Sequence, residues 1–206
     1  PVEYKLAGYS LIEIKPKLGL NFANALRSVL RQDPDVIMVG EMRDAETAQI
    51  AIQSALTGHL VFSTVHTNSA PATITRLIDM GIEPFLVSST IIGVLAQRLV
   101  RRICPECKIS YEPHPEQLRE LGINPQSFQK MGKKFCRGEG CDKCRNSGYR
   151  GRIGIHELLI MSEEIKKTIL ENSDDISIKK QCLKENMVTL RRDGVNKILY
   201  GLTTFE

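Results

Sequence analysis

The chain has 206 residues, 42% of them apolar and 25% charged, which is ordinary for a globular protein. Its net charge of +4 is too small to indicate nucleic acid as a partner, and no apolar run approaches the roughly 18 residues of a membrane-spanning helix. Six cysteines without a secretory signal indicate metal ligands or free thiols in a reducing compartment rather than disulfides. The chain begins at Pro1 without a methionine, so we expect a fragment of a longer protein.

The first forty residues predict a helix that leads into a buried strand. Residues 1–20 indicate extended structure with turns, and Asn21 then caps a helix whose apolar residues recur at helical spacing up to residue 32. Pro34 ends this helix, because proline cannot continue it. Four apolar residues follow at 36–39 between turn residues, which predicts a strand buried on both faces, as in a parallel α/β sheet.

A glutamate stands just beyond this strand, since Gly40 ends the apolar run and Glu41 follows it. The C-terminal ends of parallel strands form the edge at which open α/β sheets bind ligands. In a nucleoside triphosphatase, an acid at this edge polarises the attacking water or holds the magnesium shell. Taken alone, the run is equally consistent with a buried strand that is followed by a solvated acid.

The residues after Glu41 predict a βαβ unit. Asp44 caps a predicted helix at 45–56, Gly58 ends it, and a second buried strand follows at 60–64. Strand, helix and strand in this order pair as parallel strands. The polar residues that follow the two strands are therefore expected at the same edge of one sheet.

Two histidines bracket the second strand, with His59 before it and His66 after it. A single histidine is more often structural than catalytic, but a pair around one strand is harder to dismiss. Because the strand separates the two, only His66 is expected at the edge that carries Glu41. There the two side chains would form part of one site.

Two further helices are predicted before the cysteines. Pro71 is tolerated in the first turn of a helix that ends at Gly81. An apolar helix is then expected from about residue 85 to about residue 100. Three arginines lie near its C-terminal end, where cations favour the helix dipole, although they could instead contact phosphate or a neighbouring subunit.

Four of the six cysteines form two C-x2-C pairs that are separated by 33 residues: Cys104, Cys107, Cys141 and Cys144. This spacing fits a tetrahedral zinc site with four thiolate ligands. Such a site is structural, because four thiolates leave no open position, and zinc would offset the weak hydrophobic core of the segment between the pairs. Cys136 is interpreted as a free thiol, and six unrelated thiols are the alternative.

The end of the chain is predicted to be mainly helical. A glycine-punctuated basic loop at 148–154 is interpreted as a turn, with phosphate contact as the alternative, and a strand follows at 156–160. Helices are expected after Ser162, at about 176–185 and after Thr189. The residues expected on the buried faces of the first two are Ile165, Ile169, Leu170, Ile178, Cys182 and Leu183.

Together these elements predict an α/β protein in three consecutive parts. A parallel-sheet core occupies residues 1–103, a small tetracysteine zinc subdomain residues 104–150, and a mainly helical subdomain residues 151–206.

Residues 30–44 and 57–68 together closely resemble the type II secretion and type IV pilus assembly ATPases, a branch of the secretion ATPase superfamily. The first stretch matches the family signature in which Leu-Arg-x-x-Pro-Asp leads into an apolar strand closed by Gly-Glu-x-Arg-Asp. The second matches the family's His box. Residues 1–4, 96–99 and 148–152 and the C-x2-C pairs also match, so the resemblance covers nearly the whole chain.

The resemblance implies a RecA-like ATPase core in which Glu41 is the Walker B glutamate that activates water. Glu3 would be the acidic-box carboxylate near the metal and the water. His59 and His66 would be the His-box pair that senses or positions the γ-phosphate.

The resemblance also implies nucleotide-binding and metal-binding roles. Gly40 stands where many ATPases have a magnesium-binding aspartate, and Arg43 and Thr64 would lie with it at the nucleotide. ATP and Mg²⁺ are the implied cofactors of the full-length protein. The four paired cysteines would be the ligands of a structural Zn²⁺.

Members of this family are hexameric rings whose motions drive pseudopilin or pilin assembly through an inner-membrane platform protein. The resemblance therefore implies a homo-hexamer with secretion or pilus components as partners. It also implies a location at the cytoplasmic face of the bacterial inner membrane.

The sequence departs from the family pattern in one respect, because it contains no phosphate-binding loop of the form G-x-x-x-x-G-K-[ST]. That loop normally supplies the backbone amides, lysine and hydroxyl that hold the phosphates and magnesium. We expect it upstream of Pro1, together with the family's N-terminal domain and arginine fingers. The chain alone is then expected to bind ATP weakly or not at all.

Two other functions stay open. A non-enzymatic zinc-containing adaptor would only bind a partner, but it would have no need of Glu41 and His66. A pilus-retraction motor of the same superfamily is the second alternative, and that branch typically lacks the four-cysteine insert.

Overall fold

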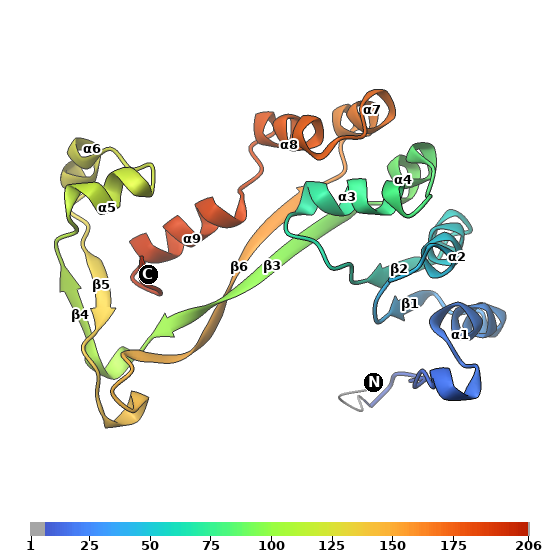
Figure 1. The fold of residues 1–206 in the computed structure, drawn as a ribbon, viewed down its shortest axis with the longest axis horizontal. Coiled ribbons are helices and arrows are strands. Elements are labelled where there is room, and N and C mark those ends of the chain that lie inside the picture. The colour runs from blue at the N-terminus through green and yellow to red at the C-terminus, as the bar shows by residue number, and fades with distance from the viewer. Residues whose placement is uncertain (1–6, 206) are drawn as a thin grey trace. The chain divides into compact units, whose positions relative to one another are not determined.

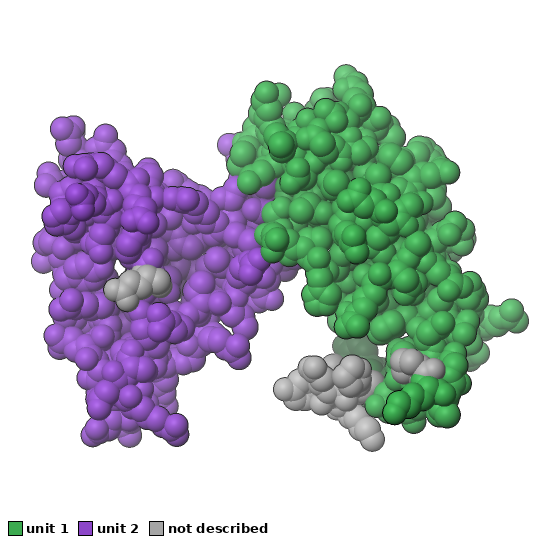
Figure 2. Space-filling view, in the orientation of Figure 1, with its two compact units in different colours: residues 1–94, 160–184 green, residues 95–159, 185–206 purple. Residues whose placement is uncertain are grey.

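The computed structural model describes residues 7–205, so Glu3 lies outside the described residues. It divides the chain into two compact units, each made of two separate segments (Figure 2). The first unit contains residues 1–94 and 160–184, and the second contains residues 95–159 and 185–206. The three consecutive parts expected from the sequence stay a prediction. Within residues 7–205, none of the helices has the length and apolar character needed to cross a membrane.

The first unit is built around a parallel pair of strands (Figure 1). β1 (Val36–Val39) pairs with β2 (Leu60–Ser63), from Val36 opposite Leu60 to Val39 opposite Ser63. The helix α2 (Ala45–Leu56) connects the two strands. The predicted βαβ unit is therefore confirmed, and with it the α/β class.

The remaining helices of the first unit are α1 (Phe22–Val29), α3 (Ala70–Asp79), α4 (Pro84–Thr90), α7 (Glu163–Glu171) and α8 (Asp175–Lys184). α1 packs on α2, while α4 packs on α7 and α3 on α8. The segments before residue 95 and after residue 159 are thus joined by helix packing.

One face of the β1–β2 sheet is packed and the other is exposed. The packed face belongs to a cluster whose buried residues are Leu26, Ile37, Val39 and Ala51. Neighbouring residues of a strand point to opposite faces, and Val36 and Met38 are 56% and 74% exposed. Leu60 and Phe62 of β2 are exposed as well. The prediction that both strands are buried on two faces is wrong, because the described residues cover only one face.

Several helices begin at the predicted residues. A side chain before each of these helices accepts a hydrogen bond from a backbone N–H of the first turn, and these capping residues are Asn21, Asp44, Ser162 and Thr189. Such a bond pairs an N–H that has no partner within the helix. The local sequence therefore determines these helix starts.

The buried faces of α7 and α8 are narrower than predicted. Their buried residues are Ile165, Ile169, Ile178 and Cys182. Leu170 and Leu183 are exposed, so the prediction that they face inward is wrong. Each directly follows a buried residue. Because successive helical side chains are rotated by about 100°, each leucine points away from the buried face.

The helix predicted from about residue 85 to about residue 100 is wrong in its second half. α4 ends at Thr90, and β3 (Gly93–Ile103) follows it and pairs with β6 (Tyr149–Ile160). β-branched residues at 91 and 92, followed by Gly93, disfavour a helix at this point. Residues 149–154, predicted as a loop, are the first half of β6, and the strand predicted at 156–160 is its second half.

The second unit has an apolar core of its own. β4 (Lys108–Tyr111) pairs antiparallel with β5 (Phe135–Gly138). The other elements are α5 (Pro115–Glu120), α6 (Pro125–Lys130) and α9 (Leu190–Leu199). The buried core residues are Leu118, Phe128, Phe135 and Ile198. Three of these residues lie between the cysteine pairs and Ile198 lies in α9, so the segment between the pairs shares a small core with the C-terminal helix.

Candidate functional site

Three polar side chains meet beyond the C-terminal ends of β1 and β2. Glu41 Oε2 lies 2.6 Å from Arg43 Nε and 3.2 Å from His66 Nε2. Both contacts use the same carboxylate oxygen. Within the described part of the chain, Glu41 Oε1 has no hydrogen-bond partner, so this oxygen can accept a hydrogen bond from water.

The three side chains differ in their exposure to solvent. Glu41 is 20% exposed, whereas Arg43 is 70% and His66 is 82% exposed. The hydrogen bond from Arg43 is the main reason why the pKa of Glu41 lies below its usual value, with burial opposing this effect and His66 adding to it. Glu41 is therefore ionised at neutral pH.

Two hydrogen bonds connect the backbone around Glu41 to the end of β2. Thr64 Oγ1 donates to the carbonyl oxygen of Gly40 at 2.7 Å. The backbone N–H of Met42 donates to the carbonyl oxygen of Thr64, with an N–O distance of 3.0 Å. These bonds hold the two strand exits together beyond the last paired residues of the sheet.

His59 lies at the opposite end of β2, as the βαβ topology predicts. Its Nδ1 is 3.0 Å from the carbonyl oxygen of Ser54 and 3.2 Å from Thr57 Oγ1, at the C-terminal end of α2. The four residues of β2 span about 13 Å, so they separate His59 from the edge that carries Glu41. The structure thus brings Glu41, Arg43 and His66 together and does not bring His59 to them.

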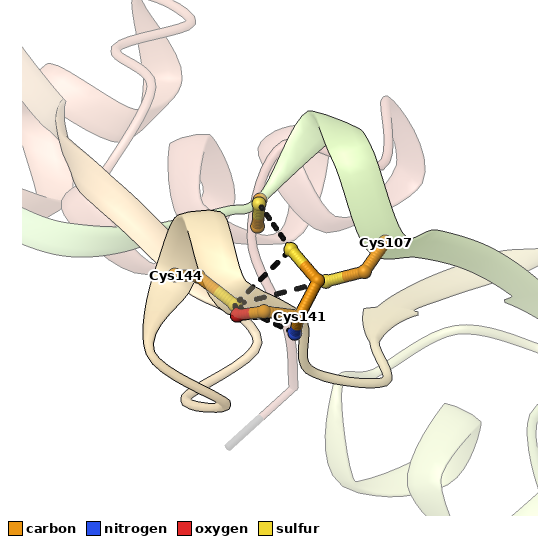
Figure 3. A group of neighbouring side chains, drawn as sticks. Cys107, Cys141 and Cys144 are labelled. Carbon is orange, nitrogen blue, oxygen red and sulfur yellow. Dashed lines mark hydrogen bonds between the residues drawn. The ribbon is translucent and has the colours of Figure 1, made fainter.

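A second group of side chains lies in the second unit, where two short turns bring four cysteines together. The turns include the 3₁₀ helices η3 (Pro105–Cys107) and η4 (Asp142–Cys144). The sulfur atoms that lie within 4.8 Å of one another belong to Cys104, Cys107, Cys141 and Cys144. Figure 3 shows three of them pointing toward one another. Cys136 is outside this group, with its Sγ 3.7 Å from Ser110 Oγ, as expected of the spare thiol.

The spacing of these sulfur atoms fits a tetrahedral metal ion. The Sγ–Sγ distances are 3.9 Å for Cys104–Cys141 and Cys107–Cys144, and 3.7 Å for Cys141–Cys144. Four zinc–sulfur bonds of about 2.3 Å in a tetrahedron require sulfur atoms about 3.8 Å apart. The four cysteines therefore fit a zinc ion with little movement of the backbone.

Backbone N–H groups point at two of the sulfurs. Gly140 N–H donates to Cys107 Sγ and Cys141 N–H donates to Cys144 Sγ, at 3.3 and 3.2 Å. Burial opposes ionisation of Cys144, but N–H donors from Cys141 and Gly148 outweigh it and lower the pKa of this thiol to about 6. Burial raises the pKa of Cys107 to about 11. The cluster thus already contains one easily ionised thiol, and the ionised thiolate is the form that binds metals.

Two glycines allow the chain before and after the second cysteine turn to approach closely, and sequence reasoning missed this contact. A Cβ atom at Gly138 would lie 2.1 Å from the carbonyl oxygen of Gly148. A Cβ atom at Gly148 would lie 2.6 Å from the carbonyl oxygen of Gly138. Both positions therefore require glycine. Glycine on each side of the second C-x2-C pair was the available signal.

Comparison with known proteins decides the family. The model of the family described as "Type II/IV secretion system protein" matches residues 1–206. The chain belongs to this family. The resemblance inferred from the motifs at 30–44 and 57–68 is therefore confirmed.

Two relatives in the type II/IV secretion family illustrate the match. The chain is 51% identical over 206 residues to the type IV pilus assembly ATPase PilB of Thermus thermophilus. The match covers the whole of this chain and 23% of PilB. The chain is 47% identical over 206 residues to the type II secretion system ATPase E of Vibrio cholerae, again covering all of the chain and 40% of that protein. The chain thus spans less than half the length of these curated relatives.

A solved structure agrees with this assignment. The crystal structure of the pilus retraction motor PilT with bound ADP superposes with a TM-score of 0.60 at 30% sequence identity. The match covers 89% of this chain and 41% of the PilT chain. This member of the type II/IV secretion family therefore shares its fold with part of the retraction motor PilT.

Proposed function

We propose that the full-length protein hydrolyses ATP to power type II secretion or type IV pilus assembly, with Glu41 as the carboxylate that activates water. The observation that carries this proposal is the convergence of Arg43 and His66 on one oxygen of Glu41, at the strand edge where α/β proteins bind ligands. The convergence orients an ionised carboxylate and leaves its other oxygen to a water molecule. A general base needs this combination of charge and access.

Each residue of the edge has a role in the proposal. Glu41 accepts the proton of the attacking water, and His66 is near enough to Glu41 to contact the phosphoryl group under attack. Arg43, Gly40 and Thr64 border the nucleotide. The phosphate-binding loop, ATP and Mg²⁺ would come together with these residues in the full-length protein, because the sequence here has no such loop.

The roles of Glu3 and His59 rest on the family motifs alone. Glu3 lies outside the described residues, and His59 contacts the end of α2 instead of Glu41. We keep them as the acidic-box carboxylate and the second His-box residue. An effect of His59 on the reaction would then pass through β2.

We also propose zinc as the metal of the four-cysteine cluster. The sulfur–sulfur distances support this choice, and so do four sulfur ligands with no carboxylate among them. The zinc would be structural, because four thiolates leave no position for a reacting water. It would link the turn that follows β3 to the turn that precedes β6.

The partners and location follow from the family in this proposal. The full-length protein would be a homo-hexamer that works with an inner-membrane platform protein at the cytoplasmic face of the inner membrane. Identities of 51% and 47% to a pilus assembly ATPase and a secretion ATPase support assembly or secretion over retraction, since the retraction motor PilT is 30% identical. A purely adaptor function would not require the Glu41 arrangement.

The test is ATP turnover by the full-length protein with Glu41→Gln. Removing a general base lowers turnover by about 100-fold or more, while nucleotide binding should persist. Glu46→Gln is the matched control, because Glu46 is an exposed acid nearby that pairs with Arg27 at 2.6 Å. The proposal fails if the wild-type protein does not hydrolyse ATP, or if Glu41→Gln is as active as the control.

A further inference from the structure

Thr64 holds the backbone on both sides of Glu41. Its hydroxyl donates to the carbonyl oxygen of Gly40, which belongs to the peptide unit before Glu41. Its own carbonyl oxygen accepts from the N–H of Met42, which belongs to the peptide unit after Glu41. One residue of the second strand exit therefore fixes both peptide units from which the glutamate side chain projects.

The backbone at Glu41 needs such a fixed point. Regular strand pairing ends where Val39 faces Ser63, and α2 begins at Ala45. Between these elements, the residues around Glu41 belong to no helix or strand. The side-chain partners of Glu41 are largely exposed, and contacts of exposed charged groups are weak and screened by solvent. The two bonds to Thr64 therefore restrain the backbone from which the carboxylate projects.

The same geometry argues against a direct contact between the Thr64 hydroxyl and a phosphate. A hydroxyl has a single hydrogen, and in Thr64 this hydrogen is directed at the carbonyl oxygen of Gly40, 2.7 Å away. Phosphate oxygens accept hydrogen bonds and do not donate them. In this arrangement the side chain of Thr64 has no donor left to offer a nucleotide.

We propose that Thr64 is a positioning residue for Glu41, which acts through the backbone of Gly40 and Met42 and does not touch the nucleotide. This inference rests on the proposed function, because it needs a reaction at Glu41. It replaces the nucleotide-binding role that the family resemblance implied for Thr64.

The test compares Thr64→Val with Thr64→Ser in the full-length protein. Valine has nearly the same shape as threonine but lacks the hydroxyl, whereas serine keeps it. We expect Thr64→Val to lower kcat by about ten-fold or more with KM for ATP changed by less than about two-fold, because a misplaced base affects the transition state alone. Thr64→Ser should keep kcat within about three-fold of the wild type. A raised KM with unchanged kcat would instead indicate nucleotide contact and overturn the inference.

A double substitution shows whether Thr64 acts through Glu41. In the Glu41→Gln background, Thr64→Val should cause no further loss of kcat, because the group that it positions is already gone. The same fractional loss in both backgrounds would overturn the inference. If the wild type hydrolyses no ATP, the proposed function fails. If Glu41→Gln is inactive while Thr64→Val is fully active, only the present inference fails.

Amide hydrogen exchange gives a readout that does not depend on activity. Peptides that contain residues 40–43 should exchange faster in the Thr64→Val protein than in the wild type, and Thr64→Ser should restore the protection. Peptides from α3, which lies elsewhere in the same unit, should be unchanged in all three proteins and so exclude general unfolding. Unchanged exchange at residues 40–43 in Thr64→Val would contradict the inference.

Discussion

The cysteine cluster and the edge around Glu41 are built in opposite ways. All four cysteines of the cluster come from two turns within one unit, and Cys104 and Cys144 are buried. At the other site, Arg43 and His66 are mostly exposed, and the sequence lacks a phosphate-binding loop. A metal site can thus be complete within a short stretch of chain. In the proposed function, the edge of the parallel sheet supplies one half of a catalytic site, and the phosphate-binding loop supplies the other half.

The largest effect is expected at the cysteine cluster. The wild type should contain about one zinc per chain, and Cys104→Ser should lose it and destabilise the second unit, on the order of several kcal/mol. Metal analysis and thermal unfolding measure the two effects. Cys136→Ser is the matched control, because Cys136 is also a buried cysteine but lies outside the cluster, and it should keep its zinc. A protein that is fully folded without metal would contradict the interpretation of the cysteine cluster as a structural zinc site.

A smaller but specific effect is expected at the strand edge. Replacing His66 by alanine removes a group that contacts Glu41 and should lower kcat of the full-length protein by about 100-fold.

His59→Ala provides the contrast to His66→Ala. It removes a contact to the C-terminal end of α2 and should cost about 1 kcal/mol of unfolding free energy, with a lesser effect on kcat. Steady-state kinetics and denaturant unfolding separate the two. Equal losses of kcat would show that the structural distinction between the two ends of β2 does not matter for the reaction.

The smallest effect concerns pH. Arg43 is the main cause of the lowered pKa of Glu41, so Arg43→Gln should raise that pKa. An ionised Glu41 is needed for activity in the proposed mechanism, and activity falls as pH drops through its pKa. The acid limb of the kcat–pH profile should therefore move to higher pH in Arg43→Gln. His66 also faces Glu41 and lowers its pKa, so the pKa of Glu41 in Arg43→Gln should still lie slightly below the usual value of a glutamate.

Arg27→Gln is the control for this pH profile. Arg27 is another exposed arginine that pairs with a glutamate, but its partner is Glu46 and not Glu41. Its profile should match that of the wild type. A shift of the same size in both variants would show that general charge, and not the contact with Glu41, sets the acid limb.

Features that depend on a few neighbouring residues could be predicted from the sequence. Capping side chains marked helix starts such as Asp44 and Ser162, and two C-x2-C pairs marked the cysteine cluster. Glu41 and His66 are 25 residues apart in sequence, and their meeting was also predictable. A βαβ connection makes the two strands parallel, so the residues that follow the strands lie at the same edge of the sheet.

Features that depend on what covers a segment could not be predicted. Val36 and Met38 look like core residues in sequence, but whether they are buried depends on a layer that the described residues do not supply. The segment before Ile103 has apolar residues at spacings that fit either a helix or a strand, and its pairing with β6 decides for the strand. The bonds from Thr64 to the backbone of Gly40 and Met42 leave no trace in the sequence pattern either.

Neither compact unit is one continuous stretch of chain, and this affects how the protein can be made. A ribosome releases α3 and α4 before their packing partners α8 and α7, which emerge only after residues 95–159 of the other unit. For that interval, apolar surfaces of α3 and α4 stay open to water and to other nascent chains. The first unit therefore completes its helix packing only after most of the second unit has been synthesised, so the two units mature in an interleaved order.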